Sequence, residues 1–218
     1  MHVVIAGGHG QIGLRLTSLL AERGDAVTGV IRNPAHREDL ERAGATPAVL
    51  DLESATAAEL AAHLEGADAV VFAAGAGPGS SAGRKDSVDR AAAVLLAEAA
   101  ALAGVRRYLL VSSINVDAPP AAGTDEVWAA YLAAKKAAED AIRASDLDWT
   151  IVRPGSLSDD PGTGRVRLVP ASGARGAVTR DDTAAVLVAL LDAPATAGAV
   201  LELFEGDVDV VAAVAALV

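Results

Sequence analysis

Residues 3–13 read VVIAGGHGQIG, an apolar β-branched run followed directly by a cluster of glycines. Gly8, Gly10 and Gly13 match the pattern G-x-G-x-x-G, and taking Gly7 in place of Gly8 gives the wider G-x-x-G-x-x-G. Such glycines allow a tight turn and close approach of the backbone to a phosphate, while the following helix points free N–H groups at the anion. A purely structural turn is the alternative. Because a strand precedes the glycines and a helix follows, the stretch favours a dinucleotide-binding loop.

The residues after this loop extend the pattern. Ile12, Leu16, Leu19 and Leu20 form one apolar stripe of a helix that Gly24 ends, and residues 26–31 predict a second strand. An Asp or Glu after that strand would accept a hydrogen bond from the adenosine 2′-hydroxyl of NAD. This chain has Arg32 there, and a guanidinium suits the 2′-phosphate of NADP. We therefore expect NADP(H), with NAD less favoured; a solvated arginine at a strand end is the alternative.

Strand-like and helix-like segments alternate along most of the chain. Further strands are predicted at residues 48–50, 67–74, 107–112, 149–152, 165–169 and 199–204, and further helices at 55–64, 85–103, 127–144, 183–191 and 208–217. Nearly continuous Val, Ile and Leu runs indicate strands that are buried on both faces. We expect an α/β fold, a single-domain doubly wound (Rossmann-type) parallel sheet with helices on both faces. Asp181 and Asp182, at the start of one helix, are expected to cap it.

The composition limits the number of domains and the kinds of ligand and partner that the chain can have. The 218 residues suit one domain spanning 1–218, and the absence of cysteine excludes disulfides, zinc–thiolate sites and a cysteine nucleophile. Four scattered histidines predict no metal site, and the formal charge of −11 disfavours nucleic acid. No charged-then-apolar leader and no apolar stretch of about 18 residues is present, so we expect a cytoplasmic protein without membrane contact. A small-molecule substrate and a monomer or homodimer are expected.

Ligands of doubly wound sheets bind beyond the carboxyl ends of the strands. The loops expected at that edge are residues 7–13, 32–34, 51–52, 74–79, 112–117 and 153–157. Residues 76–84, 117–126 and 156–179 are expected to form the walls of a substrate pocket, the last of them as a small substrate region.

Tyr131 and Lys135 form a second informative pattern. At this spacing on a helix their side chains share a face, one turn apart. A lysine ammonium beside a tyrosine hydroxyl stabilises the phenolate, which makes the tyrosine a usable acid or base near neutral pH. Ser113, at the end of the predicted strand 107–112, could hydrogen-bond a substrate oxygen. The alternative is a surface tyrosine and a solvated lysine that happen to be four residues apart.

Taken in order, these segments resemble the short-chain dehydrogenase/reductase superfamily. The resemblance covers essentially the whole chain. Within the superfamily, the chain resembles most specifically an atypical group, the NmrA-like and flavin- or biliverdin-reductase-like proteins. The resemblance rests on residues 7–13 (GGHGQIG), 73–75 (AAG), 111–113 (VSS), 131–135 (YLAAK), 148–155 (DWTIVRPG) and 179–184 (TRDDTA).

The resemblance implies roles for particular residues. It implies NAD(P) binding by Gly7, Gly10, Gln11, Ile12, Gly13, Arg32, Asp51, Leu52, Ala73, Ala74, Gly75 and Lys135. In active members a Ser/Tyr/Lys set moves the proton while the nicotinamide carries hydride, which implies Ser113, Tyr131 and Lys135 here.

Three functions remain open at this point. The first is an NADPH-dependent oxidoreductase of the short-chain dehydrogenase/reductase type, acting on a small carbonyl, quinone or flavin-like acceptor. The second is an NADP(H)-binding, redox-sensing regulatory protein whose role depends on a protein partner. The third is an NAD(P)-dependent epimerase or dehydratase, disfavoured because little chain follows Gly155 to build a nucleotide-sugar domain.

Overall fold

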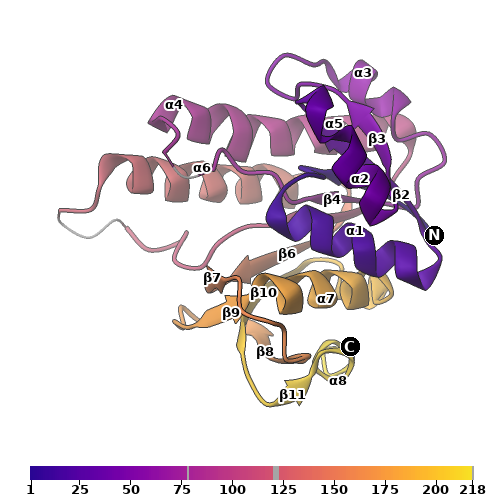
Figure 1. Cartoon of the computed structure of the whole chain (residues 1–218). Helices are drawn as coiled ribbons and strands as arrows, with labels where there is room; N and C mark the ends of the chain where they lie inside the picture. Colours follow the sequence, from indigo (N-terminus) through magenta and orange to yellow (C-terminus); the bar gives the residue numbers. More distant parts are fainter. Residues whose placement is uncertain (78, 120–122, 218) are drawn as a thin grey trace.

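A computed structural model describes residues 1–77, 79–119 and 123–217, and its centre is a large, mostly parallel sheet (Figure 1). The strands of this sheet are β1 (His2–Ala6), β2 (Ala26–Ile31), β3 (Thr46–Val49), β4 (Ala69–Phe72), β5 (Arg107–Val111), β6 (Asp148–Pro154), β8 (Arg165–Pro170), β10 (Ala199–Glu205) and β11 (Val208–Asp209). They lie in the order β11-β8-β10-β6-β5-β4-β1-β2-β3. Two short strands, β7 (Ser156–Ser158) and β9 (Ala177–Thr179), form a separate parallel pair.

The helices connect these strands. They are α1 (Gln11–Arg23), α2 (Arg37–Ala43), α3 (Ala57–Ala62), α4 (Ala82–Arg84), α5 (Ala92–Ala103), α6 (Glu126–Arg143), α7 (Arg180–Leu191) and α8 (Val210–Ala215). Short 3₁₀ turns occur at η1 (Pro34–His36) and η3 (Pro194–Thr196), and η2 (Lys85–Ala91) is π-helical. None of the described helices is long and apolar enough to cross a membrane.

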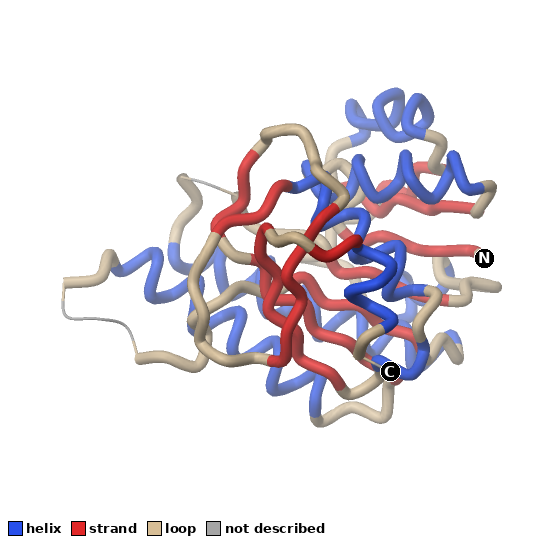
Figure 2. Tube along the Cα trace, turned by 90° about the horizontal axis from the view of Figure 1, so that it is seen from below, coloured by secondary structure: helices blue, strands red, loops and turns tan. Residues whose placement is uncertain are grey.

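The expected doubly wound fold is confirmed, with its core divided between the two faces of the sheet. Successive residues of β1 point to opposite faces. Val3 and Ile5 therefore belong to a cluster that includes residues of α1, α7 and α8, and Val4 and Ala6 to one that includes residues of α3, α5 and α6. The strands run through the middle of the molecule with helices outside them (Figure 2). Burial on both faces explains why these strands read as continuous apolar runs.

One edge of the sheet departs from the parallel arrangement. Strand β10 pairs in parallel with β6, but β8 pairs with β10, and β11 with β8, in antiparallel fashion. The burial of β8 alternates along the strand, with Val166 buried and its neighbours exposed. Antiparallel strands tolerate water on one face, so a half-polar strand such as β8 fits near this edge, between β10 and the short β11.

Three local predictions are corrected. Helix α2 was not expected, because Leu40 is its one buried residue and a single apolar position gives no period. The helix expected at residues 85–103 begins with the π-helical η2. Asp181 and Asp182 are not the cap of α7: Thr179 is, and its hydroxyl accepts the hydrogen bond from the Asp182 N–H. The two carboxylates instead accept hydrogen bonds from the backbone of residues 162–164.

Candidate functional site

The glycine loop packs its backbone too tightly for side chains. Gly7 has φ +87°, and a Cβ there would lie 2.6 Å from the Cα of Ala74; a Cβ on Gly13 would lie 2.4 Å from the carbonyl oxygen of Gly7. Gly10 precedes α1 without providing a side-chain cap. The first-turn N–H groups of a helix have no partner within it, so those of α1 remain available to an anion. This cradle fits the pyrophosphate of a dinucleotide.

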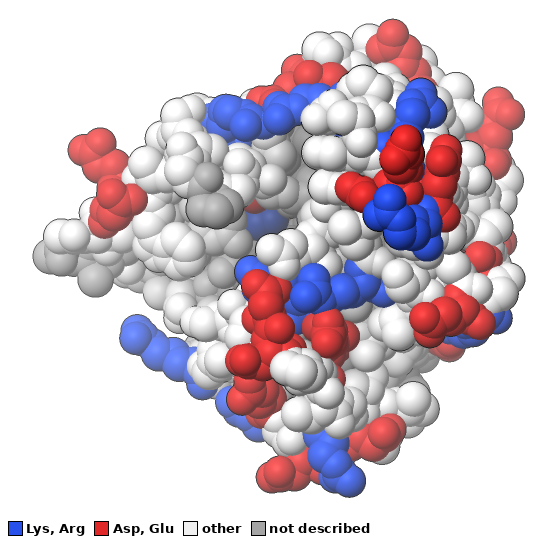
Figure 3. Space-filling view, viewed as in Figure 1, with Lys and Arg blue, Asp and Glu red and all other residues white. Residues whose placement is uncertain are grey.

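A cavity of about 300 Å³ opens beside this loop at the carboxyl ends of β1 to β4. The surface is hollowed between the side that carries α4 and α6 and the side that carries α1 (Figure 3). Seven residues expected to bind the cofactor line the cavity, namely Gly7, Gly10, Arg32, Asp51, Leu52, Ala74 and Gly75. The other five do not: Gln11, Ile12 and Gly13 lie in the first turn of α1, Ala73 follows β4, and Lys135 is a buried residue of α6.

Other lining residues were not named from the sequence as cofactor-binding residues. They are His9, Val30, Ile31, Asn33, His36, Leu50, Glu53, Val88, Ala92 and Arg84. His9 and Asn33 lie in loops expected at this edge and Arg84 ends the expected pocket wall 76–84, whereas Val88 and Ala92 belong to a segment predicted only as a helix. Pro78 and residues 120–122, within the expected pocket walls, lie outside the described part of the chain.

His9 lines this cavity, and its side chain contacts residues beyond the glycine loop. Its ring stacks on that of His36, with 3.6 Å between centroids, and its Nε2 lies 2.9 Å from Asp39. Hydrogen bonds from His9 and Arg42 hold the pKa of the Asp39 carboxyl below its usual range. This contact joins the glycine loop to η1 and α2 along one wall of the cavity.

A charged cluster stands at another wall. Arg32 and Arg84 both donate to Oε2 of Glu53, at 2.9 and 2.8 Å, and the Ser87 hydroxyl donates to Oε1 at 2.6 Å. The hydrogen bonds from Arg84 and Ser87 lower the pKa of Glu53. The Arg32 side chain is 55% exposed, so it is free enough to change partners. Three elements meet in this cluster, since Arg32 follows β2, Glu53 follows β3 and Arg84 ends α4.

Lys135 is held at the junction of β5, η2 and α6. Its ammonium donates to the Val111 carbonyl at 3.1 Å and lies 3.3 Å from Oδ1 of Asp89, with both side chains almost fully buried. Oδ2 of Asp89 accepts from the Ala76 N–H at 3.2 Å, which ties down the loop after β4. Asp89 belongs to the π-helical η2, a kind of segment frequent at functional sites. It was missed because nothing near it in the sequence marks it.

Tyr131 and Lys135 do share a face of α6. The Lys135 ammonium lies 5.8 Å from the centroid of the Tyr131 ring, which also stacks on Trp128 at 5.0 Å. Lys85 lies over the same ring at 5.3 Å and donates to the Gly77 carbonyl at 2.9 Å. Ser113 is half-buried just beyond β5, two residues after the carbonyl that Lys135 binds.

A buried ion pair between Glu139 and Arg153 lies next to the strand end that Lys135 contacts. Glu139, on α6, accepts two hydrogen bonds from Arg153, at 2.8 and 2.5 Å, and one from the Ser112 hydroxyl at 2.6 Å. Arg153 also donates to Asp117 at 2.6 Å, and this contact lowers the pKa of the Asp117 carboxyl. The network links α6 to the carboxyl ends of β5 and β6.

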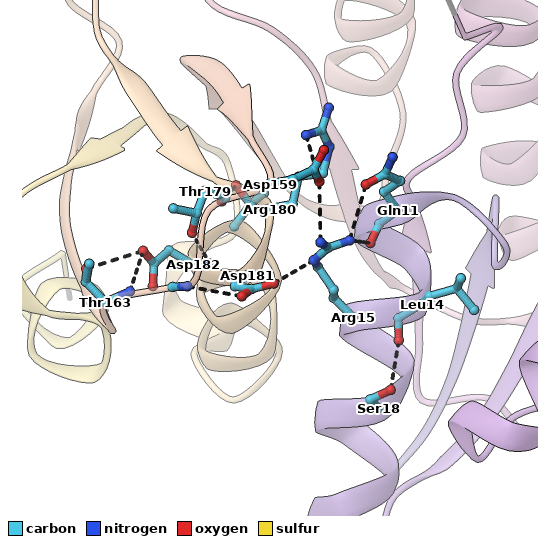
Figure 4. Close-up of polar contacts among 12 residues, drawn as sticks. Gln11, Leu14, Arg15, Ser18, Asp159, Thr163, Thr179, Arg180, Asp181 and Asp182 are labelled. Atoms are coloured by element: carbon cyan, nitrogen blue, oxygen red, sulfur yellow. Dashed lines mark hydrogen bonds and ion pairs between the residues drawn. The ribbon is translucent and has the colours of Figure 1, made fainter.

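A second ionic network joins α1 to the chain around residues 159–164. Arg15 donates to Asp181 at 2.6 Å and lies 3.3 Å from Asp159, while its Nη1 donates to the Gln11 carbonyl at 2.9 Å (Figure 4). Arg180 lies 3.0 Å from the same Asp159. The helix that follows the glycine loop is thus attached to part of the expected substrate wall.

Comparison with known proteins agrees with this geometry. The family described as NAD(P)H-binding matches residues 7–194. YhfK of Bacillus subtilis, described as an uncharacterised sugar epimerase, is 36% identical over 208 residues that cover 95% of each chain. A Bacillus halodurans structure described as an NAD-dependent epimerase/dehydratase is 32% identical and superposes with a TM-score of 0.91, covering 99% of both chains. ChuY of Escherichia coli O157:H7, an anaerobillin reductase, is 26% identical with a TM-score of 0.76, covering 96% of this chain and 99% of its own.

The match with the family spans most of the chain, and the relatives align nearly end to end. The glycine loop agrees with this assignment, because its backbone packs too closely for side chains, as the loop of a dinucleotide-binding fold does. The chain therefore belongs to the NAD(P)H-binding family, as an atypical member of the short-chain dehydrogenase/reductase superfamily with a Rossmann-type fold.

Proposed function

We propose that this protein is an NADPH-dependent oxidoreductase that reduces a small carbonyl, quinone or flavin-like acceptor. When bound, the nicotinamide supplies a hydride. The proposal rests on one observation above all: Lys135 fastens α6 to the carboxyl end of β5, with Tyr131 one turn away on the same face. Ser113 follows that strand end, so a proton donor and a hydrogen-bonding hydroxyl belong to one corner of the molecule.

In this proposal Tyr131 donates a proton to the oxygen of the substrate carbonyl group whose carbon receives the hydride. Ser113 hydrogen-bonds the same oxygen and orients it. Lys135 holds the nicotinamide ribose and faces the tyrosine ring. Asp89 and the Val111 carbonyl fix the position of the ammonium, so the lysine is oriented before any ligand arrives. Residues 156–179 would form the small substrate region, which the Arg15 network attaches to α1.

Cofactor choice provides a first test. Arg32→Ala is expected to weaken NADPH binding by about one to two decades, because a hydrogen bond to a charged group contributes roughly 1.5–3 kcal/mol. NADH binding should change little, since NADH has no 2′-phosphate. Fluorescence titration of both reduced cofactors against both proteins measures the ratio.

The matched control is Arg42→Ala, which removes an exposed arginine of α2 that pairs with Asp39. It should leave both dissociation constants within about twofold, since exposed ion pairs contribute little. Equal affinities of the unmodified protein for NADPH and NADH would contradict the assignment of NADP(H).

A further inference from the structure

Arg32 and Arg84 bind the Glu53 carboxylate in the way that an anion-binding site binds its ligand. All three residues line the cavity beside the glycine loop. Oε2 of Glu53 accepts from both arginines, and Oε1 accepts from Ser87 at 2.6 Å and from Arg84 Nε at 3.4 Å. Each carboxylate oxygen thus accepts two hydrogen bonds, and the donors come from two segments that are distant in the sequence and meet at Glu53.

The donor set matches a phosphate as well as it matches a carboxylate. Guanidinium groups bind either anion through paired N–H donors, and a phosphate monoester offers three acceptor oxygens. Two guanidinium groups against one carboxylate leave one positive charge in the cluster. The lowered pKa of Glu53 means that the carboxylate remains ionised at neutral pH and does not release its partners by protonation.

We propose that Glu53 is a specificity-determining residue, an internal anion that competes with the 2′-phosphate of NADP(H) for Arg32 and Arg84. Arg84 then belongs to the 2′-phosphate site beside Arg32, although the sequence placed it only in the expected substrate wall 76–84. The carboxylate limits the preference for the phosphorylated cofactor, because the incoming phosphate must share or displace it. This inference rests on the proposed use of NADP(H), and it concerns binding alone.

A purely structural role for Glu53 makes a different prediction. Arg84 ends the short α4, so the carboxylate could serve only to hold that segment at the mouth of the cavity. Loss of its charge would then loosen the whole part of the cavity that receives the adenosine, and the affinity for phosphorylated and unphosphorylated ligands would fall alike. The two roles differ in the sign of the effect on the phosphorylated ligand.

The experiment uses two probes that differ at the 2′-position, adenosine 2′,5′-bisphosphate and adenosine 5′-monophosphate. Their dissociation constants are measured by calorimetry on the full chain. Glu53→Gln, which keeps the shape and removes the charge, is expected to tighten the bisphosphate by about tenfold, an amount equivalent to about 1.4 kcal/mol. Arg84→Ala should weaken it by about the same factor. Both variants should leave the monophosphate within about twofold.

The control is Glu65→Gln, which removes the same charge from an exposed residue between α3 and β4. It should alter neither constant, which separates the local contact from the change in net charge. Weaker binding of both probes to Glu53→Gln, or an unchanged ratio of the two constants in Arg84→Ala, would overturn the proposal. These binding ratios do not depend on turnover, so they test the role of Glu53 even if the protein reduces no acceptor. If the protein is an active reductase but the ratios are unchanged in the variants, this inference is wrong and the proposed function is unaffected.

Discussion

Tyr131→Phe is expected to lower kcat by about two to four decades, the usual contribution of a positioned general acid. The change removes one oxygen atom and retains the ring, which packs against Trp128 and faces Lys85 and Lys135. The dissociation constant of NADPH should therefore stay within about twofold. Steady-state rates with a panel of carbonyl, quinone and flavin acceptors, together with a fluorescence titration of NADPH, measure both quantities.

The chain contains a matched control, because it has only two tyrosines. Tyr108 is fully buried, and its hydroxyl donates to the Ala93 carbonyl at 2.9 Å. Burial raises the pKa of this hydroxyl well above its ordinary value. Tyr108→Phe should lower the free energy of unfolding by about 1 kcal/mol, the net contribution of one hydrogen bond, without changing kcat.

Two outcomes would contradict the role given to Tyr131. If Tyr131→Phe reduces a flavin-type acceptor at the original rate, hydride transfer needs no protein acid and the tyrosine assignment is wrong. If the unmodified protein reduces no acceptor of the panel, the redox-sensing alternative gains support, and a partner protein should then bind differently in the presence of NADPH and NADP⁺.

The second large effect is expected on stability. Glu139→Ala should lower the free energy of unfolding by about 3–5 kcal/mol, the range found when one member of a buried ion pair is removed. The change removes the buried one of the two carboxylates that pair with the Arg153 side chain, which is 3% exposed, and the Ser112 hydroxyl loses its acceptor. Denaturation by urea, monitored by circular dichroism, measures the difference.

Asp140→Ala is the control on the same helix. This neighbouring carboxylate is 54% exposed and pairs with Lys136 one turn earlier. An exposed pair at this spacing contributes roughly 0.3–0.5 kcal/mol, so the variant should unfold almost as the original protein does. A Glu139→Ala protein that loses less than about 1 kcal/mol would show that Asp117 and water satisfy Arg153 by themselves.

Local patterns in the sequence were enough to predict the architecture. The strands β1, β2, β4, β5 and β6 were expected from their continuous apolar runs, because a strand buried on both faces needs apolar side chains at successive positions. The longer helices α1, α5 and α6 were expected from their apolar stripes, because an amphipathic helix imposes a repeat. The shared face of Tyr131 and Lys135 was predictable for the same reason, since one helical turn separates them. The helix α2 was missed because it contributes only Leu40 to the core.

The partners of the charged side chains were decided by tertiary structure. Asp89 pairs with Lys135 because the crossover connections of the sheet place η2 against α6. Glu53 meets Arg84, and Arg15 meets Asp181, for a similar reason: segments that are distant in sequence are packed together by the fold, in the second case the helices α1 and α7. The position of a charged residue in the sequence does not indicate which residue it will pair with, because ion pairs between distant segments follow no repeat. The sequence by itself therefore determined the parallel strands, most of the helices and the cofactor loop, whereas the antiparallel edge of the sheet and the choice of ion pairs around the cavity followed from strand order and packing.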